Sequence, residues 1–516
     1  MVLCTGDLAA QCLVNDRRLE TFVLTGGTET AQRILHHRPE LHLLAETGGK
    51  NATIVTSLCD RDMAIKNVLH SAFSHAGQKC SATSLLLLEE EVYHDAKFRE
   101  ALIDAVESMH VGPVWDLKTK MGPLIRPPQG ALARGLKELE PGESWLLMPK
   151  NLNGNPCLWS PGIKWNARPG SFTHCTELFG PVLAVMPFRH LDEAIDTVVQ
   201  TGYGLTSGLE SLDDREQARW MSRMRAGNLY VNRPTTGAIV LRQPFGGMGK
   251  SAFGPGIKAG GPNYVVPLLR VATPAAPAEK AIATTPGRSS EGGGNTEVVL
   301  RIPQLQHLWE QLAESRSEAA QQVRQQLGPS GWYALQRALS DYDAFARAEI
   351  RRYHDTYRLI GQDNFRRYLP MTHLRIRLTP RDTWLDCLAR IAAVVAVGGR
   401  AAVSVTPEVE PQRAEILEAL TERWAADLEY LEETDEQLVE AIEIGQVDRL
   451  RYAGPWASPA VRAAADRQFI YVAEDPVQLC GRIELLWYVR EQSVSIDYHR
   501  YGNLGARVTE PRREPW

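Results

Sequence analysis

Short strand-like runs alternate with helix-like segments along most of the chain, and this alternation restricts the possible folds more than any other feature. In the first half, β-rich runs end in polar turns and are followed by stretches with apolar residues at helical spacing. The expected strands are 21–24, 53–55, 84–88, 182–186 and 228–231, and the expected helices are 28–35, 60–74, 94–109, 191–201 and 213–224. This order predicts an α/β fold in which helices cover a sheet.

A stretch rich in Ala, Pro, Gly, Ser and Thr, from Ala272 to Asn295, divides the chain into two halves. It has no apolar period and cannot bury enough surface to offset the entropy lost on ordering. We therefore predict a linker over 272–297.

The second half repeats the strand and helix alternation after a long helical region. The expected elements are helices at 302–353, 383–394 and 412–426 and strands at 374–378 and 402–405. This order predicts a partial doubly wound sheet. Alternating apolar residues within 483–507 predict an edge hairpin or flap.

Composition excludes several classes of function. The chain has 516 residues, of which 44% are hydrophobic and 23% charged, so it is not a mostly disordered protein. A net charge of −5 gives no reason to expect nucleic acid or an anionic membrane surface as a partner. The sequence contains no apolar run of the roughly 20 residues that a membrane span needs. Eight irregularly spaced cysteines and a first segment without basic residues favour a reducing, cytoplasmic location. Isolated histidines predict no metal site.

Two short motifs carry chemistry. Glu46 precedes a Thr-Gly-Gly turn, where the backbone can approach a ligand closely, and Cys80 follows Gly-Gln-Lys on a loop after a helix. The neighbouring cation, Lys79, favours the nucleophilic thiolate. A thiolate that attacks a carbonyl and a carboxylate that activates water would together form and release a thioester. Taken singly, such a cysteine is more often a small buried apolar residue, and such a glutamate is more often a solvated turn residue.

Further motifs accompany this pair in order along the first half. They are Phe22-Val-Leu-Thr-Gly-Gly-Thr-Glu29, Glu177-Leu-Phe-Gly-Pro-Val182, Gly204-Leu-Thr-Ser-Gly-Leu209, Gly227-Asn-Leu-Tyr-Val-Asn-Arg233 and Pro244-Phe-Gly-Gly-Met-Gly-Lys-Ser251. With the Glu46 and Cys80 motifs, they make residues 1–270 resemble the aldehyde dehydrogenase superfamily. Within it, the chain is most similar to the L-glutamate γ-semialdehyde (Δ1-pyrroline-5-carboxylate) dehydrogenases found in the bifunctional proline utilisation A (PutA) proteins. The segment 481–503 resembles the closing motif of the longer PutA proteins.

The resemblance implies a role for each matching residue. Cys80 is the nucleophile and Glu46 the general base that releases the thioester. The residues implied to hold NAD are Thr25, Gly26, Gly27, Thr47, Gly48, Glu177 and Phe179. The residues implied to bind the substrate, through its α-carboxylate and aliphatic chain, are Ser81, Gly237, Ala238 and Phe245. The family usually has Ser where this chain has Gly27, so one hydroxyl contact to the cofactor is lost.

The resemblance also implies a division of the chain into parts. They are a C-terminal remnant of the NAD-binding domain (1–45), the catalytic domain (46–228), a substrate-anchor and oligomerisation segment (229–271), the linker (272–297) and a non-catalytic aldehyde-dehydrogenase-like domain with a β-flap (298–516). Much of the family's dinucleotide-binding domain, including the Asn that stabilises the oxyanion, would precede Met1, so we expect an N-terminally truncated chain.

Three functions follow from these observations. The first is NAD-dependent oxidation of L-glutamate γ-semialdehyde to L-glutamate, in a homo-oligomer and with proline dehydrogenase or the missing N-terminal part as partner. The second is a non-catalytic assembly or lid module of a proline-catabolic enzyme. The third is a dehydrogenase for another semialdehyde that carries a carboxylate.

Overall fold

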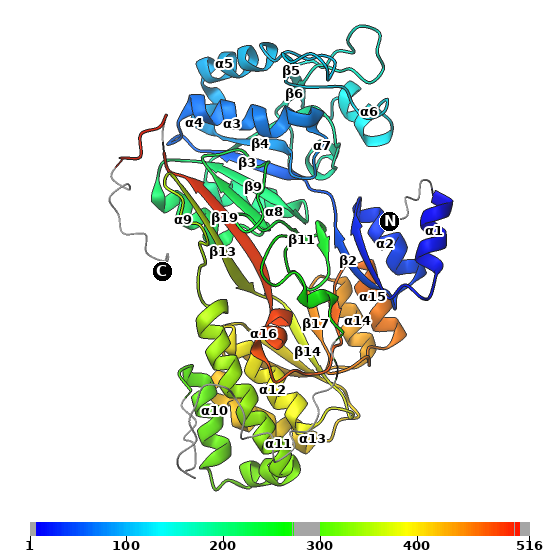
Figure 1. Cartoon of the computed structure of the whole chain (residues 1–516), viewed down its shortest axis with the longest axis vertical. Helices are drawn as coiled ribbons and strands as arrows, with labels where there is room; N and C mark the ends of the chain where they lie inside the picture. Colours follow the sequence, from blue (N-terminus) through cyan, green and yellow to red (C-terminus); the bar gives the residue numbers. More distant parts are fainter. Residues whose placement is uncertain (1–6, 271, 273–299, 500, 506–516) are drawn as a thin grey trace.

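A nine-stranded sheet runs through the middle of the molecule (Figure 1). The computed structural model describes residues 7–270, 272, 300–499 and 501–505. Of the predicted linker, only Ala272 lies among these residues. In spatial order, the strands are β13 (Gln362–Pro370), β19 (Val489–Asp497), β10 (Asn228–Val231), β9 (Thr206–Glu210), β3 (Asn51–Val55), β4 (Thr83–Glu89), β7 (Val182–Phe188), β6 (Gly162–Trp165) and β5 (Ser144–Leu147). Pairing is parallel from β19 to β6 and antiparallel at both edges.

Strand β4 shows why this part of the sequence forms a sheet covered on both faces. Its run of four leucines alternates between two apolar clusters: Leu86 and Leu88 pack in one, Leu85 and Leu87 in the other. A strand that is buried on both faces needs such a continuous apolar run. The first-half helices are α1 (Asp7–Asn15), α2 (Thr28–His37), α3 (Arg61–Phe73), α4 (Glu90–His94), α5 (Ala96–Glu107), α6 (Gly130–Lys137), α7 (Phe172–Cys175), α8 (Leu191–Gln200) and α9 (Asp214–Arg223). Helices α3 and α5 cover one face, and α8 and α9 cover the other.

The predicted strands and helices of the first half are confirmed to within a few residues at their ends. The helix expected over 94–109 is α5, and its start is fixed by Asp95. Its side chain accepts a hydrogen bond from the backbone N–H of Lys97 (2.9 Å) and so starts α5 as a separate helix after α4.

A second sheet of five parallel strands forms the lower part of the molecule in Figure 1. Its spatial order is β16 (Leu428–Glu432), β15 (Ala401–Val405), β14 (Leu374–Leu378), β17 (Arg449–Arg451) and β18 (Val472–Ala473). Strand order reverses on either side of β14, as in a doubly wound fold, which confirms the predicted class. The helices of this half are α10 (Pro303–Ala313), α11 (Glu318–Phe345), α12 (Trp384–Ala396), α13 (Pro411–Thr421), α14 (Asp435–Glu443), α15 (Pro459–Arg467) and α16 (Gly481–Glu484).

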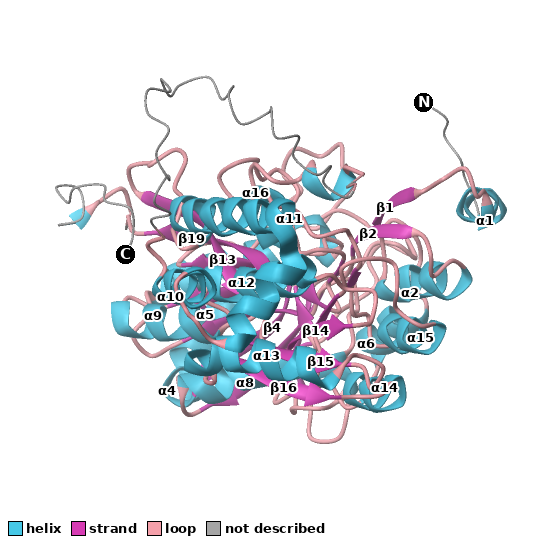
Figure 2. Cartoon of the chain, turned by 90° about the horizontal axis from the view of Figure 1, so that it is seen from below, coloured by secondary structure: helices cyan, strands magenta, loops and turns pink. Residues whose placement is uncertain are grey.

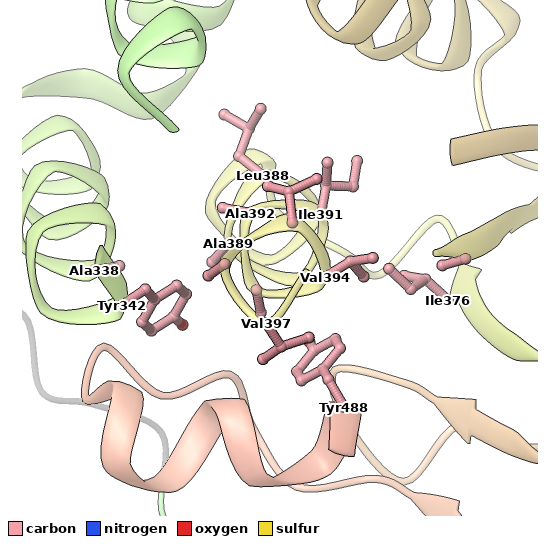
Figure 3. Close-up of a cluster of buried hydrophobic side chains, with 14 of the residues drawn as sticks. Ala338, Tyr342, Ile376, Leu388, Ala389, Ile391, Ala392, Val394, Val397 and Tyr488 are labelled. Atoms are coloured by element: carbon pink, nitrogen blue, oxygen red, sulfur yellow. The ribbon is translucent and has the colours of Figure 1, made fainter. Parts of the chain in front are cut away.

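Helix α12 lies at the centre of the second core. Apart from Asp386 and Arg390 it is apolar, and side chains from α11, from the sheet and from the segment before β19 surround it (Figure 3). Leu388, Ala392 and Val394 on this helix are fully buried. A helix without a polar face is stable only when it is enclosed in this way.

The long helical region expected over 302–353 is confirmed, and it consists of two helices. Helix α10 ends at Ala313, and α11 begins after Ser317, whose hydroxyl accepts a hydrogen bond from the backbone N–H of Ala320 (3.3 Å). Ser317 therefore caps a new helix. A kink at Gly328-Pro329 then bends α11.

The edge hairpin or flap expected over 483–507 is also wrong for the residues that the structure describes. Strand β19 is an interior strand of the nine-stranded sheet, between β10 of the first half and β13 of the second. In Figure 1 it crosses the molecule diagonally and links the two halves. Its buried residues Val494 and Ile496 pack in the same apolar cluster as β10 and α9.

A small three-stranded sheet lies beside the main one, in the order β1 (Thr21–Thr25), β2 (His42–Glu46) and β12 (Ala252–Phe253). Helix α2, which follows β1, lies next to α15 of the second half in both views (Figures 1 and 2). A two-stranded ladder, β8 (Tyr203–Gly204) with β11 (Met248–Gly249), completes the sheets. Among the described residues, no helix is long and apolar enough to cross a membrane.

Candidate active site

The carboxylate of Glu46 lies at the end of β2, where three chain segments meet. Its residue pairs with Thr25 on one side and Ala252 on the other. One oxygen, Oε2, accepts a hydrogen bond from the backbone N–H of Gly247 (2.9 Å). Burial raises the pKa of Glu46 to about 7, although the charge of Lys258 and the Gly247 N–H act in the opposite direction. This carboxylate can therefore take up and release a proton near neutral pH.

Cys80 lies on a loop that neighbouring strands hold from several directions. The amide of Asn51, on β3, donates to the carbonyl oxygens of Cys80 (2.6 Å) and Ala82 (3.0 Å). The carbonyl of Ser81 accepts from the hydroxyl groups of Thr206 (3.3 Å) and Thr235 (3.0 Å). The thiol itself is half-buried. Because its backbone is bonded to three segments, the position of the thiol is well defined.

The expected effect of Lys79 on the thiol is wrong. Burial raises the pKa of Cys80, and the negative charges of Glu177 and Glu46 raise it further, while the N–H groups of Cys80 and Ser81 act in the opposite direction. Lys79 is not among the groups that shift it. The thiol is thus protonated at rest, and it needs a base before it can act as a nucleophile. The same interactions show that Cys80, Glu46 and Glu177 share one electrostatic environment.

Glu177 is held against the Thr-Gly-Gly turn that follows Glu46. Its Oε1 accepts a hydrogen bond from the backbone N–H of Gly49 (2.8 Å). A methyl group on Gly48 would lie 1.9 Å from Oε2 of Glu177, so a side chain there would displace this carboxylate. Burial raises the pKa of Glu177, against the Gly49 N–H and the charge of Lys50. Lys50 is buried as well, which lowers its pKa to about 8.

The other residues implied to hold NAD surround this turn. Thr25, Gly26 and Gly27 connect β1 to the N-terminus of α2, where Gly27 supplies no side-chain cap. The N–H of Gly26 donates to the carbonyl of Glu46 (3.2 Å), and the N–H of Thr47 donates to the carbonyl of Ser251 (2.9 Å). An uncapped helix N-terminus suits a phosphate group. Phe179 is 41% exposed, which is unusual for a phenylalanine and leaves a ring free to pack against a flat ligand.

These residues fit one end of a dinucleotide. They provide backbone donors at a helix end, an exposed aromatic ring and a carboxylate that could accept from ribose hydroxyl groups.

The implied substrate residues are distributed around the same loop. Ser81 is buried. Gly237 and Ala238 are exposed, two residues beyond the Thr235 that bonds to Ser81. Phe245 is half-buried, forms a bridge with Ala259 and directly precedes the glycines that contact Glu46. Thr235 thus connects the Gly237 segment to the Cys80 loop, and Phe245 lies in the segment that contacts Glu46.

Sequence reasoning missed three buried residues next to this site. Asn51 holds the Cys80 loop, and Asn228 accepts a hydrogen bond from Lys258 (3.0 Å). Both asparagines lie within or beside the motifs noted in the sequence, and Lys258 lies seven residues after the last of these motifs in the first half. All three side chains are at most 2% exposed, which distinguishes them from ordinary polar residues. The sequence does not show this burial. Within the described part of the chain, no group of three His, Cys, Asp or Glu residues could hold a metal ion.

Comparisons with known proteins show which family this chain resembles. The aldehyde dehydrogenase family model matches residues 1–273. The 1-pyrroline-5-carboxylate dehydrogenase of Geobacillus kaustophilus is 31% identical over 280 residues, which are 52% of this chain and 53% of that protein. The bifunctional protein PutA of Escherichia coli is 31% identical over 424 residues, which are 77% of this chain and 29% of that protein. The chain therefore spans about half or less of the length of these relatives.

A solved structure extends the likeness to both halves. Proline utilization A (PutA) from Corynebacterium freiburgense superposes with a TM-score of 0.72 and 34% identity, over 96% of this chain and 43% of that one.

The fold and site together define an α/β protein with a half-buried thiol whose pKa is raised by two nearby carboxylates. The family match covers more than half of the sequence, and the chain belongs to the aldehyde dehydrogenase family.

Proposed function

We propose that this chain is part of an NAD-dependent dehydrogenase that oxidises L-glutamate γ-semialdehyde, formed from Δ1-pyrroline-5-carboxylate, to L-glutamate in proline catabolism. The observation that carries the proposal is the Cys80 thiol in the field of Glu46, a carboxyl group whose pKa is about 7. The names of its relatives, 1-pyrroline-5-carboxylate dehydrogenase and PutA, support the substrate.

The chain's own residues act before and after the oxidation. Glu46 accepts the proton of Cys80, and the thiolate attacks the aldehyde carbon to form a hemithioacetal. NAD, when bound beside Glu177 and Phe179, supplies the acceptor for hydride. Glu46 then gives this first proton to solvent. It later takes a proton from water, the resulting hydroxide attacks the thioester carbon, and the C–S bond breaks to release L-glutamate and a Cys80 thiolate that regains its proton from Glu46. A base with a pKa near neutrality suits both proton transfers.

Recognition of the substrate carboxylate is assigned to the loops on either side of the thiol. Gly237 has a positive φ of 88°, and a loop with such glycines can direct backbone N–H groups at an anion. Ser81 adds a hydroxyl next to the nucleophile, and Phe245 covers the aliphatic part of the substrate. Another semialdehyde with a carboxylate would use the same groups, so Ser81→Ala should raise KM for L-glutamate γ-semialdehyde more than KM for an aliphatic aldehyde.

The rest of the expected organisation belongs to this proposal. We propose the division into 1–45, 46–228, 229–271, 272–297 and 298–516, a homo-oligomer, a cytoplasmic location, and a proline dehydrogenase or N-terminal part as partner. The described cysteines are all free thiols, which supports a reducing compartment.

The test is NADH formation from Δ1-pyrroline-5-carboxylate, measured for the chain alone and with the N-terminal part of a PutA relative added. Cys80→Ala should abolish NADH formation. A variant that keeps its turnover, or a wild-type chain that is inactive under both conditions, would refute the proposal.

A further inference from the structure

One peptide unit connects Glu46 to a buried lysine. The N–H of Gly247 donates to Oε2 of Glu46 (2.9 Å), and the carbonyl of Gly246 accepts from Nζ of Lys258. These two groups are the opposite ends of the same amide. Lys258 is 1% exposed, and its Nζ also donates to Oδ1 of Asn228 (3.0 Å). The lysine therefore fixes and polarises the amide that holds the carboxylate of Glu46.

The packing around this amide leaves little room for rearrangement. A methyl group on Gly227 would lie 1.7 Å from the carbonyl oxygen of Gly246 and 2.5 Å from Nζ of Lys258. The lysine is thus confined between β10 and the Gly246 turn, so its charge has one position relative to Glu46.

A carboxylate from the second half of the chain holds the lysine segment. Oε2 of Glu491, on β19, accepts from the backbone N–H of Lys258 (3.0 Å). Its Oε1 accepts from the amide of Asn263 (2.9 Å), which also donates to the hydroxyl of Tyr368 on β13 (2.6 Å). Glu491 is 1% exposed. A charge buried this deeply needs partners, and these partners are the Lys258 segment and β13.

Ser493, two residues after Glu491 on strand β19, also contacts the segments that hold Lys258. The N–H of Ser493 donates to the carbonyl of Gly227 (2.9 Å), and its hydroxyl donates to the carbonyl of Pro244 (2.6 Å). Glu491 thus contacts the backbone of Lys258, and Ser493 contacts Gly227 and Pro244, which lie in the segments that hold the side chain of Lys258. A displacement of β19 would move the lysine.

We propose that Lys258 and Glu491 are positioning residues for the general base, so that the second half of the chain completes the catalytic site through β19. This inference rests on the proposed function, because it assumes that Glu46 acts as a base. It assigns to the second half a part in the hydrolysis of the thioester, in addition to any role in assembly.

The charges along this path determine the expected effect. The titratable groups around Glu46 are Lys258, Cys80 and Tyr264. Those around Lys258 are Glu46 and Glu491. Those around Glu491 are Lys258, Arg366 and Tyr368. The charge of Lys258 lowers the pKa of Glu46 against burial. Burial in turn lowers the pKa of Lys258 to about 7, and the charges of Glu46 and Glu491 raise it. Without the lysine charge, Glu46 should hold its proton to a higher pH.

Hydrolysis of p-nitrophenyl acetate tests this without NAD. The ester transfers its acetyl group to Cys80 and releases p-nitrophenolate as a burst, and water assisted by Glu46 then hydrolyses the thioester at a steady rate. Lys258→Met should keep the burst amplitude. Its steady rate should be roughly tenfold lower at pH 6, with the midpoint of the pH profile about one unit higher. Glu491→Gln should shift the midpoint in the same direction by less, because it acts through the lysine.

Lys250→Met is the matched control. This lysine lies eight residues before Lys258, but it is exposed and its Nζ donates to the carbonyl of Thr201 (3.4 Å). It should leave both phases unchanged. An unshifted midpoint in Lys258→Met, or the loss of its burst in a folded protein, would overturn the inference. If Lys258→Met does not fold, the midpoint of the pH profile of Glu491→Gln tests the inference in its place, and an unshifted midpoint overturns it. A wild-type chain without a burst would instead refute the proposed function.

Discussion

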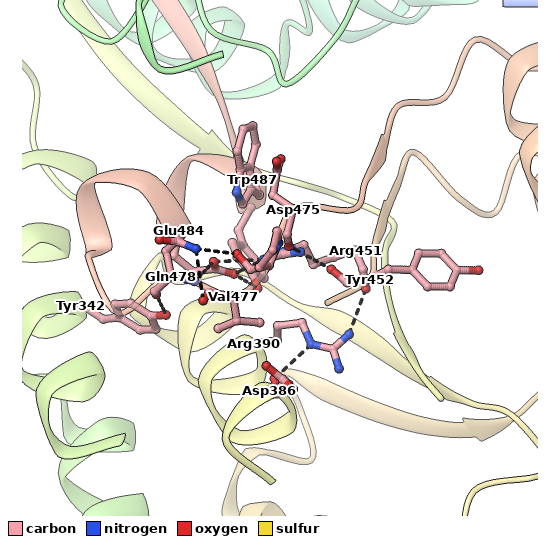
Figure 4. A network of polar contacts seen from close by, with 12 residues as sticks. Tyr342, Asp386, Arg390, Arg451, Tyr452, Asp475, Val477, Gln478, Glu484 and Trp487 are labelled. Atoms are coloured by element: carbon pink, nitrogen blue, oxygen red, sulfur yellow. Dashed lines mark hydrogen bonds and ion pairs between the residues drawn. The ribbon is translucent and has the colours of Figure 1, made fainter. Parts of the chain in front are cut away.

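Substituting Glu484 by Gln should destabilise the second half of the molecule. Glu484 and Arg451 are both fully buried and form the centre of a polar network (Figure 4). Arg451 donates to both carboxylate oxygens, at 2.8–3.2 Å. The hydroxyl of Tyr488 donates to Oε1 (2.8 Å), and the N–H of Gln478 donates to Oε2 (2.9 Å). Every partner of this carboxylate is therefore a donor.

The size of the effect follows from that arrangement. In Glu484→Gln, the amide NH₂ replaces one acceptor and must face a donor in either orientation, while Arg451 loses its buried counter-charge. Removal of one partner from a buried ion pair typically costs about 3–5 kcal/mol. The same substitution should loosen the start of β19, because Glu484 lies just before the segment 485–488 that leads into it.

Urea unfolding followed by tryptophan fluorescence measures this loss, because Trp487 is buried beside the network. The control is Glu443→Gln, which removes an exposed ion pair with Arg467 (2.7 Å) and should cost about 1 kcal/mol or less. If Glu484→Gln lowers the free energy of unfolding no more than this control, the pair does not stabilise the second half as argued.

Three further predictions concern the site and the core. The steady phase of ester hydrolysis should rise with pH to half its maximum near pH 7, because only deprotonated Glu46 can accept a proton; Glu46→Gln should slow both the burst and the steady phase and lose this profile, and a profile unchanged in the variant would contradict the role. Gly48→Ala should weaken NAD binding, measured by titration calorimetry, by about tenfold or more, which is about 1.4 kcal/mol, since the methyl group would displace Glu177. Equal affinities would contradict that placement. Leu388→Ala should cost about 2–5 kcal/mol in urea unfolding, because this leucine is fully buried on α12, and a cost below about 1 kcal/mol would show that the core closes around the gap.

Much of the local structure could be predicted from the sequence because local signals decide it. The leucine run of β4 and the apolar spacing of α3 place these elements, and the capping Asp60 marks the start of α3. Ser317 carries the same kind of signal, yet the predicted helical region 302–353 runs through it. Apolar periodicity continues across a cap, so the capping side chain has to be weighed against it.

The chemistry of the site was less predictable. Lys79 adjoins Cys80 in sequence, but two carboxylates that are distant in sequence decide the pKa of the thiol. The structure also brings Lys258, 212 residues further along the chain, to within one peptide unit of Glu46, and it brings Glu491, 445 residues further along, to the backbone of Lys258.

The sequence alone determined the α/β class, the succession of strands and helices and the motifs of the aldehyde dehydrogenase family, because spacing and residue type encode them directly. Only the tertiary structure decided that β19 enters the main sheet between β10 and β13. Backbone pairing in a sheet depends on which strands meet in space. Strands with similar apolar patterns could occupy the same position in the sheet, and the local sequence does not distinguish between them. The burial that brings Glu46 and Lys258 close to neutral pKa values has the same origin, since it is the packing of distant segments that removes water from both groups.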